Sequence, residues 1–194
     1  MKVALDNLGC PLNFAETSTL AEQFLNQGYE QVPFSEKADV YVINTCSVTH
    51  EADRKSRRSV KKARKLNSGA KIVVAGCYAQ LQPQKIAALE GVDLILGNDE
   101  KFNILDYIED YSKNKIPDIH ISDSDEMVKF HTSHSRGDRT RSFLKVQNGC
   151  DYRCSYCTIP LARGKSSNQP INQLVEQAQT IARSGDKENI LTLI

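Results

Sequence analysis

Short apolar runs alternate with longer amphipathic stretches over residues 1–116. The runs Asp39–Asn44 and Lys71–Gly76 are largely apolar and β-branched, which is typical of strands buried on both faces. Apolar residues spaced three or four apart predict helices between such runs. The other strands are expected at Lys2–Asp6 and Asp93–Leu96, and the helices at Phe14–Gln27, Glu51–Leu66, Gln82–Leu89 and Lys101–Tyr111. The alternation predicts an α/β domain, flavodoxin-like or Rossmann-like, with a parallel sheet and helices on both sides.

The first predicted helix has candidate signals at both ends. Asn13 is a residue type that caps helix N-termini. Gly28 is the type that commonly ends a helix, because glycine accepts the left-handed conformation there. We therefore expect this helix to begin beside Asn13 and to end before Gly28.

The pattern changes after residue 116. Residues 117–141 hold two Ser-Asp steps and the loop-like Ser135–Asp138, which predict a linker. Short extended pieces within it are expected at Ile119–Ile121 and Met127–Phe130. A second unit, residues 142–194, is expected to contain a strand at Ser142–Gln147, a helix at Pro170–Ser184 and a strand at Asn189–Ile194. Two parallel strands and one helix cannot bury a core alone, so we expect this sequence to end inside a larger second domain.

The composition is that of an ordinary soluble protein. Of the 194 residues 40% are hydrophobic and 25% charged, with a net charge of +1, so any nucleic-acid affinity must come from local basic patches. The apolar runs are far shorter than the roughly 20 residues of a membrane helix, and the N-terminus lacks the apolar region of a signal peptide. We therefore expect a cytoplasmic protein with no membrane partner. Thiols stay reduced in that compartment, which favours metal-ligating or catalytic roles for the six cysteines.

Three of these cysteines lie within eight residues, directly after a predicted strand. They are Cys150, Cys154 and Cys157, and below they are called the loop cysteines. A structural zinc site needs four ligands, for which His131 or His134 is a possible fourth. A cubane [4Fe–4S] cluster needs only three thiolates if its fourth iron is left open to a substrate. The spacing favours the iron–sulfur interpretation and leaves zinc open.

The other three cysteines each follow a predicted strand. They are Cys10, Cys46 and Cys77, and below they are called the sheet-edge cysteines. The carboxyl ends of parallel strands share one edge of a sheet, and ligands collect there. These thiols are therefore predicted to meet and to hold a second cluster. The alternative is three unrelated buried cysteines, since free cysteine behaves as a small hydrophobe.

The segments around both sets resemble the radical S-adenosylmethionine methylthiotransferases. Residues 143–165, FLKVQNGCDYRCSYCTIPLARGK, resemble the family's radical core. Leu8-Gly9-Cys10 with Asn13 and Glu16, residues 44–49 (NTCSVT) and residues 76–80 (GCYAQ) resemble its N-terminal domain. Pro11 departs from the pattern but removes no ligand. In that family the remaining barrel and an RNA-binding TRAM domain follow, which this sequence does not contain.

The resemblance implies a cofactor set and roles for the cysteines. The loop cysteines would bind a [4Fe–4S] cluster that cleaves S-adenosylmethionine, and the sheet-edge cysteines a second [4Fe–4S] cluster that presents the sulfur. Tyr156 would lie near the bound S-adenosylmethionine, or its ring merely packs the loop against the barrel. An electron donor such as a flavodoxin or ferredoxin would be a partner. Residues 142–194 would then be the first part of a partial TIM-like barrel. No side chain is singled out as a catalytic acid, base or nucleophile.

Residues 49–57 resemble the branch of the family that acts on threonylcarbamoyladenosine beside the tRNA anticodon. The same predicted helix holds eight cations within residues 54–65, with acidic residues only at its N-terminal end. Unpaired cations favour a polyanionic partner, although charge runs are more often solvated helix faces. The residues predicted to contact the tRNA anticodon stem-loop are Arg54, Lys55, Arg57, Arg58, Lys61 and Lys62. Ala52, Ser56, Val60 and Ala63 form the narrow face expected to pack on the sheet.

Several weaker candidates and rival functions stay open. Arg136, Arg139 and Arg141 would extend an RNA-binding face or simply keep the linker soluble, and Asp53 and Asp99 are expected to be helix-end residues. The rival activities are methylthiolation of isopentenyladenosine in tRNA and of an aspartate on a ribosomal protein. The non-enzymatic rival is a structural zinc or electron-transfer iron–sulfur module.

Overall fold

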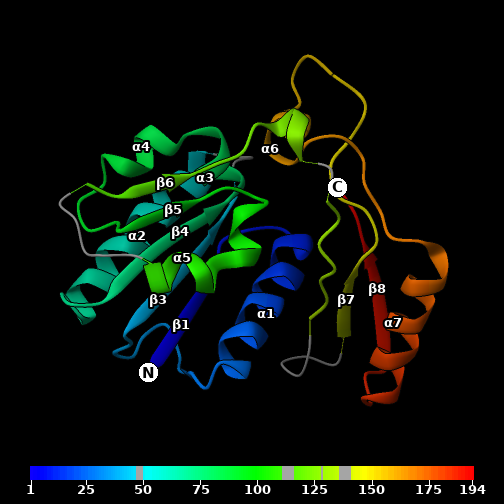
Figure 1. Ribbon diagram of the computed structural model, residues 1–194, viewed down its shortest axis with the longest axis horizontal. Helices are drawn as coiled ribbons and strands as arrows, with labels where there is room; N and C mark the ends of the chain where they lie inside the picture. The colour runs from blue at the N-terminus through cyan, green and yellow to red at the C-terminus, as the bar shows by residue number, and fades with distance from the viewer. Residues whose placement is uncertain (47–49, 111–115, 128, 136–140) are drawn as a thin grey trace.

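The centre of the molecule is a six-stranded, entirely parallel sheet (Figure 1). The computed structural model describes residues 1–46, 50–110, 116–127, 129–135 and 141–194, with only the backbone at 50–53 and 110. The strands run in the order β2-β1-β3-β4-β5-β6. Their bounds are β1 Lys2–Asn7, β2 Glu30–Gln31, β3 Val40–Thr45, β4 Lys71–Gly76, β5 Leu94–Leu96 and β6 Asp118–His120. The predicted α/β class and parallel sheet are confirmed.

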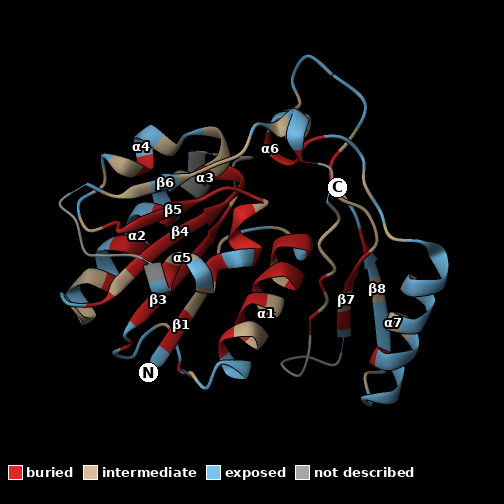
Figure 2. Ribbon diagram, viewed as in Figure 1, coloured by how far each residue is buried: buried red, intermediate tan, exposed pale blue. Residues whose placement is uncertain are grey.

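Helices cover both faces of this sheet, as the pattern of the strands requires. The helices are α1 Pro11–Asn26, α2 His50–Leu66, α3 Cys77–Leu81, α4 Pro83–Ala87, the 3-10 helix η1 Glu100–Asn103 and α5 Ile104–Asp110. In β3, Tyr41 and Ile43 pack with α2, α3 and α4, whereas Val40 and Val42 pack with α1 and α5. All four side chains are fully buried. Because burying such a side chain contributes roughly 1.5–3 kcal/mol, this central strand anchors two cores at once (Figure 2).

The second unit is a two-stranded parallel sheet with two helices. It contains β7 Arg141–Lys145, α6 Ile159–Arg163, α7 Ile171–Arg183 and β8 Glu188–Thr192, and the 3-10 helix η2 Ser124–Glu126 precedes it. β7 lies beside α1, where Phe14 and Phe143 meet edge to face with ring centroids 5.8 Å apart. Large apolar side chains such as Ile171 and Val175 remain exposed on α7 (Figure 2). This small unit does not bury its own apolar surface, as the sequence predicted.

Several elements differ from the sequence-based expectation. Asn13 is not a cap: α1 begins at Pro11 with Cys10 in the N-cap position, and the side chain of Cys10 makes no capping hydrogen bond. Helices α3 and α6 were not predicted, because five residues are too few to show a helical period. β6 occurs where an extended piece was expected in the linker, and it joins the first sheet beside β5. Of the second such piece, residue 128 lies outside the described residues, and the described remainder is not a strand.

No helix among the described residues is long and apolar enough to cross a membrane.

The end of β4 depends on one glycine conformation. Gly76 has φ 96° and ψ −163°, a region that residues with a side chain essentially do not occupy. A Cβ atom there would lie 2.4 Å from Asn44 Oδ1 and 2.6 Å from the Thr45 carbonyl oxygen. We therefore expect Gly76→Ala to lower the free energy of unfolding by about 3 kcal/mol or more, from backbone strain plus overpacking.

Gly28→Ala is the matched control for this prediction. Gly28 also has a positive φ, 80°, but open space surrounds it, so its loss should be about 1–2 kcal/mol from strain alone. Urea unfolding of both variants measures the difference. Equal losses would contradict the steric argument.

Candidate metal centres

The three sheet-edge cysteines follow the ends of three adjacent parallel strands. The register pairs Asn7 with Asn44 and Thr45 with Gly76, so β1, β3 and β4 end side by side. Cys46 and Cys77 come directly after β3 and β4, and Cys10 stands three residues beyond β1. Cys77 is buried, while the other two are partly exposed. The topology thus brings the three positions to one edge of the sheet, as predicted.

None of the six cysteines is joined in a disulfide. Within the described ranges, no three His, Cys, Asp or Glu side chains are arranged closely enough to hold a metal ion. The fold therefore gives the sheet-edge cysteines a shared edge of the sheet, and the ligand geometry itself is not preformed among the described residues.

Asn13 ties the start of α1 to the ends of the neighbouring strands. Its Nδ2 donates to the Thr45 carbonyl at 2.9 Å, and its own carbonyl accepts from Asn44 Nδ2 at 3.1 Å. The Asn44 amide also donates to Thr17 Oγ1 at 2.9 Å. These bonds are buried, where hydrogen bonds to backbone groups hold geometry firmly. Asn13 therefore positions the loop that carries Cys10, a role that the predicted capping did not foresee.

A buried carboxylate beside this edge binds three cations from three elements. Glu16 on α1 contacts Lys101 of η1 at 2.7 Å, Lys145 of β7 at 2.8 Å and Arg163 of α6 at 2.9 and 3.1 Å. All four side chains are 0–1% exposed. We call these four residues the Glu16 network. Glu16 thereby joins the first unit to residues 142–194 with charge-assisted hydrogen bonds.

The Glu16 network reaches the sulfur of Cys77 through Asn98. Asn98 Nδ2 donates to Cys77 Sγ at 3.5 Å and to the Ala162 carbonyl at 2.6 Å. Lys101 Nζ donates to Asn98 Oδ1 at 2.8 Å, which fixes the orientation of the amide. Asn98 is buried. Sequence reasoning missed Asn98 and Lys101, because nothing local marks polar residues that act only through tertiary contacts.

The loop cysteines lie on the connection between β7 and α6. Cys150 N donates to the Gly164 carbonyl, and Cys157 N donates to the Cys154 carbonyl, both at 3.1 Å. Gly149 has φ 75°, and a Cβ there would lie 2.3 Å from the Lys165 carbonyl oxygen, so the loop returns closely upon itself. A pocket of about 230 Å³ is lined by Cys154, Cys157 and residues of η2 and α6. Tyr156 is 88% exposed, so its ring does not pack against other described residues.

The comparisons with known proteins match this arrangement. Residues 2–97 match the family described as "Uncharacterized protein family UPF0004". The chain is 40% identical over 194 residues to threonylcarbamoyladenosine tRNA methylthiotransferase MtaB of Aquifex aeolicus (strain VF5), covering 99% of this chain and 47% of that protein. The Bacillus subtilis (strain 168) protein of the same name is 38% identical over 195 residues, with coverages of 98% and 43%. The chain belongs to the methylthiotransferase family.

A relative with a different named substrate is less similar. The chain is 30% identical over 190 residues to tRNA-2-methylthio-N(6)-dimethylallyladenosine synthase of Thermodesulfovibrio yellowstonii, covering 96% of this chain and 43% of that protein. The chain spans less than half the length of the relatives described. The family uses iron–sulfur groups and S-adenosylmethionine in general, and cysteine thiolates are the donors that iron–sulfur clusters take. Both cysteine sets fit that chemistry.

Of the two histidines considered as zinc ligands, His131 has a side-chain partner and His134 takes part in a backbone bridge. His131 Nε2 contacts Asp99 Oδ1, and the ring stacks on Phe102 with centroids 4.2 Å apart. Burial lowers the pKa of His131, against the opposing effect of Asp99. His134 pairs with Leu144 in an antiparallel bridge. His131 therefore fastens the linker to η1, and Asp99 acts as its partner besides flanking a helix.

Helix α2 presents a basic face to solvent. The six residues predicted to bind RNA, together with Lys65, are exposed. Ser56, Val60 and Ala63 face the sheet as expected, while the side chain of Ala52 lies outside the described residues. Arg64 is the exception among the eight cations. Its guanidinium contacts Asp93 at 2.8 Å and also binds backbone carbonyls, including that of Ala70, so it holds α2 on the sheet.

The linker arginines are only partly described. Arg136 and Arg139 lie outside the described residues. Arg141 Nε pairs with Glu188 at 2.8 Å across β7 and β8. This pair joins two exposed strand residues, so the structure gives Arg141 a partner within the chain itself.

Burial and mutual charge shift the pKa values of the Glu16 network. Burial acts to raise the pKa of Glu16, but Arg163, Lys101 and Lys145 outweigh it and hold that pKa well below its ordinary value. Burial lowers the pKa of Lys101. Burial likewise lowers the pKa of Lys145 to about 8, with Glu16 opposing and Arg163 and Lys101 adding to the decrease. The rings of Phe102 and Phe130 also face the Lys145 ammonium, at 5.4 and 5.2 Å.

The shifted pKa of Lys145 predicts a pH-dependent stability in the reduced, metal-free protein. Lys145 has a pKa of about 8 when folded and 10.5 as its ordinary value. Between these values the unfolded chain binds more protons, so the free energy of unfolding rises with pH there. The contribution is about 3 kcal/mol in total, and below pH 8 it no longer changes.

Lys145→Met tests this prediction, because the difference in unfolding free energy between the wild-type protein and this variant isolates the contribution of Lys145. Urea unfolding under excess thiol reductant is measured for both proteins between pH 7.5 and about pH 10. Titration of cysteines and tyrosines is common to both and cancels in the difference. The wild-type protein should gain stability relative to the variant as pH rises, and parallel profiles would refute the shift.

Proposed function

We propose that the complete protein transfers a methylthio group to threonylcarbamoyladenosine beside the tRNA anticodon. The observation that carries this proposal is the pair of cysteine sets, one at the ends of three parallel strands and one on the loop after β7. One set alone fits many iron–sulfur proteins. Two sets on two units joined through Glu16 fit an enzyme that needs both a radical source and a sulfur source.

The two sets take different roles in this proposal. The loop cysteines hold a [4Fe–4S] cluster with one open iron for S-adenosylmethionine, and the sheet-edge cysteines hold a second [4Fe–4S] cluster. When bound, these groups supply radical generation and sulfur. Tyr156 and the pocket at Cys154 and Cys157 lie where S-adenosylmethionine would bind. A flavodoxin or ferredoxin is the expected electron donor, and the cytoplasm the expected compartment.

The proposed domain organisation follows the sequence-based division. Residues 1–116 form the methylthiotransferase N-terminal domain, 117–141 the linker, and 142–194 the start of the radical barrel. The division is supported by the two separate sheets. It includes one refinement, since β6 of the linker hydrogen-bonds to β5 of the first sheet. The exposed apolar residues of α7 support a larger barrel, because they offer a surface for further elements to cover.

The substrate assignment rests on the printed names of the relatives and on α2. The relatives at 40% and 38% identity are named for threonylcarbamoyladenosine, and the one at 30% for dimethylallyladenosine. Exposed cations along α2 supply the phosphate-binding surface that a tRNA stem-loop requires. The runner-up is the same reaction on dimethylallyladenosine or isopentenyladenosine.

Iron counting in the complete protein tests the cofactor assignment. Anaerobic reconstitution should give about eight irons per chain if each set holds a cubane. Cys46→Ala and Cys154→Ala should each reduce this to about four, and the double variant to near none. Each single variant is the control for the other. A count of about four in the wild-type protein would remove one assignment.

Nucleoside analysis in a deletion strain tests the reaction. Digested tRNA should lose the methylthio form of threonylcarbamoyladenosine, and neither Cys46→Ala nor Cys154→Ala should restore it. Loss of methylthiolated dimethylallyladenosine would support the runner-up. A mass change on a ribosomal protein, with tRNA unaffected, would overturn both.

Salt dependence tests the basic face of α2. Changing Arg57, Arg58, Lys61 and Lys62 to Gln should weaken tRNA binding and lower the slope of log affinity against log salt by about 3, at 0.7–0.9 per phosphate contact. The matched control replaces Lys37, Lys85, Arg183 and Lys187 with Gln. These residues are exposed and lie outside α2, and the control variant has the same net charge as the α2 variant. Equal slopes in the two quadruple variants would refute the α2 interface.

A further inference from the structure

The Glu16 network contains more positive than negative charge. Its three cations surround one carboxylate, and no second carboxylate among the described residues lies within 4.0 Å of them. All the side chains are buried. Buried charge without compensation is strongly destabilising. An anionic group held beside the network would offset this excess of positive charge.

The sulfur of Cys77 lies beside this network, where a cluster bound through it would bring negative charge. Asn98, oriented by Lys101, donates to the sulfur of Cys77. Burial acts to lower the pKa of Arg163, but Cys77, Glu16 and Cys10 outweigh it and raise that pKa above its ordinary value. The guanidinium thus lies close to two of the three thiols. Its buried Nε has no hydrogen-bond partner among the described residues, which leaves one donor available beside them.

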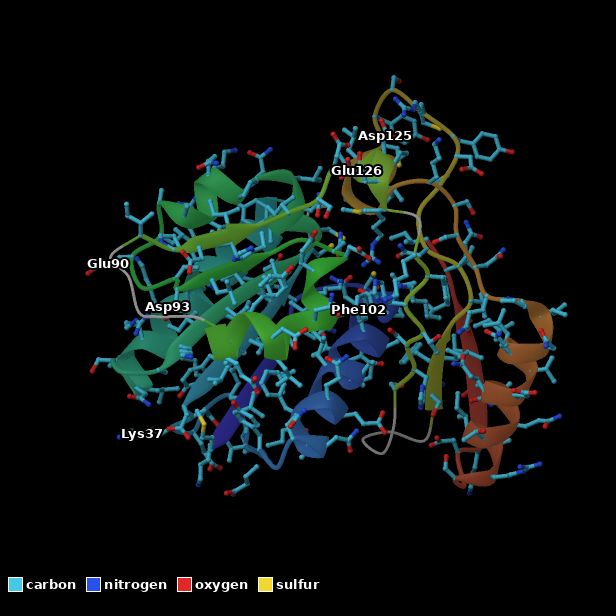
Figure 3. All side chains as sticks on the ribbon, in the orientation of Figure 1. Lys37, Glu90, Asp93, Phe102, Asp125 and Glu126 are labelled. Carbon is cyan, nitrogen blue, oxygen red and sulfur yellow. The ribbon has the colours of Figure 1, made fainter. Side chains whose placement is uncertain are left out.

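Aromatic rings shield this group of charges from water. The ammonium groups of Lys101 and Lys145 each lie 5.4 Å from the centre of the Phe102 ring. Phe102 lies between the two units, where Figure 3 labels it. The His131 ring covers the same phenyl group. Charges act more strongly on each other where water is excluded, so the cations influence the nearby sulfurs with little screening.

We propose that the Glu16 network and Asn98 raise the reduction potential of the group held by Cys10, Cys46 and Cys77. This rests on the proposed function, which places an iron–sulfur cluster there. Three thiolates give such a cluster a net negative charge, and its potential depends on charge and on hydrogen bonds to sulfur. The step is the transfer of one electron to this cluster from the flavodoxin or ferredoxin donor of the proposed function, with no bond formed or broken. Buried cations favour that added negative charge.

The network also makes this potential depend on the second unit. Lys145 and Arg163 belong to residues 142–194, whereas Glu16 and Lys101 belong to the first unit. Two of the three cations beside the sheet-edge cysteines are therefore supplied by the element pair β7 and α6 that flanks the loop cysteines. Residues that flank the loop cysteines in sequence thus tune the reduction potential of the cluster at the sheet-edge cysteines.

The test measures potentials in the complete protein with the three loop cysteines changed to Ala. Only the sheet-edge cysteines can then hold a cluster, which the iron and sulfide content of the reconstituted protein verifies. The electron paramagnetic resonance signal is followed during anaerobic titration with dithionite. Lys101→Met removes a buried positive charge and Glu16→Gln a negative one. Lys37→Met, on an exposed residue far from the network (Figure 3), is the control.

The two network variants should shift the potential in opposite directions. Lys101→Met should lower the equilibrium constant for one-electron reduction at least tenfold, which is 59 mV, and Glu16→Gln should raise it. Lys37→Met should leave it unchanged. If the network acts only in folding or packing, the two variants should not shift the reduction potential in opposite directions. If the Lys101→Met protein binds no iron, the same measurement is made on Lys145→Met instead.

The failures of the two proposals are distinguishable. If the parent protein takes up no iron, the proposed function fails. If it binds about four irons but the variants shift the potential in the same direction or not at all, only the tuning role fails. Loss of iron from all three network variants would also overturn the tuning role, in favour of a purely structural one.

Discussion

The contact between Glu16 and its three cations is the interaction on which the arrangement of both units depends. One carboxylate on α1 receives Lys101 from the first unit and Lys145 and Arg163 from the second. Phe14 of α1 and Phe143 of β7 also pack edge to face where the two units meet. Charged groups are costly to bury, and they persist in an interior only when geometry and hydrogen bonding compensate them. The network therefore specifies one way of docking the units, because any other would leave charges buried and unpaired.

The second constraint is the parallel sheet itself. Parallel pairing places every strand end on one edge, and here the connections after the three adjacent strands β1, β3 and β4 each carry a cysteine. Glycine and asparagine residues make the edge compact: Gly76 lets β4 turn directly into α3, and Asn13 binds the carbonyl of Thr45. The cysteines are consequently held by backbone geometry, and the polar residues around them are held by each other.

The cations of helix α2 serve two different purposes. Six of the cations predicted for RNA contact face solvent, whereas Arg64 binds Asp93 and fastens the helix to the sheet. Arg64 is no different from its neighbours in the sequence. It differs in position, because it faces the starts of β4 and β5, where the Ala70 carbonyl and the buried Asp93 carboxylate lie within reach.

The sequence by itself determined most of the strands, the long helices and the shared edge of the cysteines, but it did not predict the two-residue strand β2. Apolar β-branched runs such as Lys71–Gly76 and the order of strand, cysteine and helix are local signals that can be read along the chain. The short helices α3 and α6 were decided by the tertiary structure, because five residues carry too little pattern. The Glu16 network was also decided there. Residues 85 to 147 positions apart meet in it, and nothing in a linear sequence distinguishes a lysine that will lie beside a sulfur from one that will lie in water.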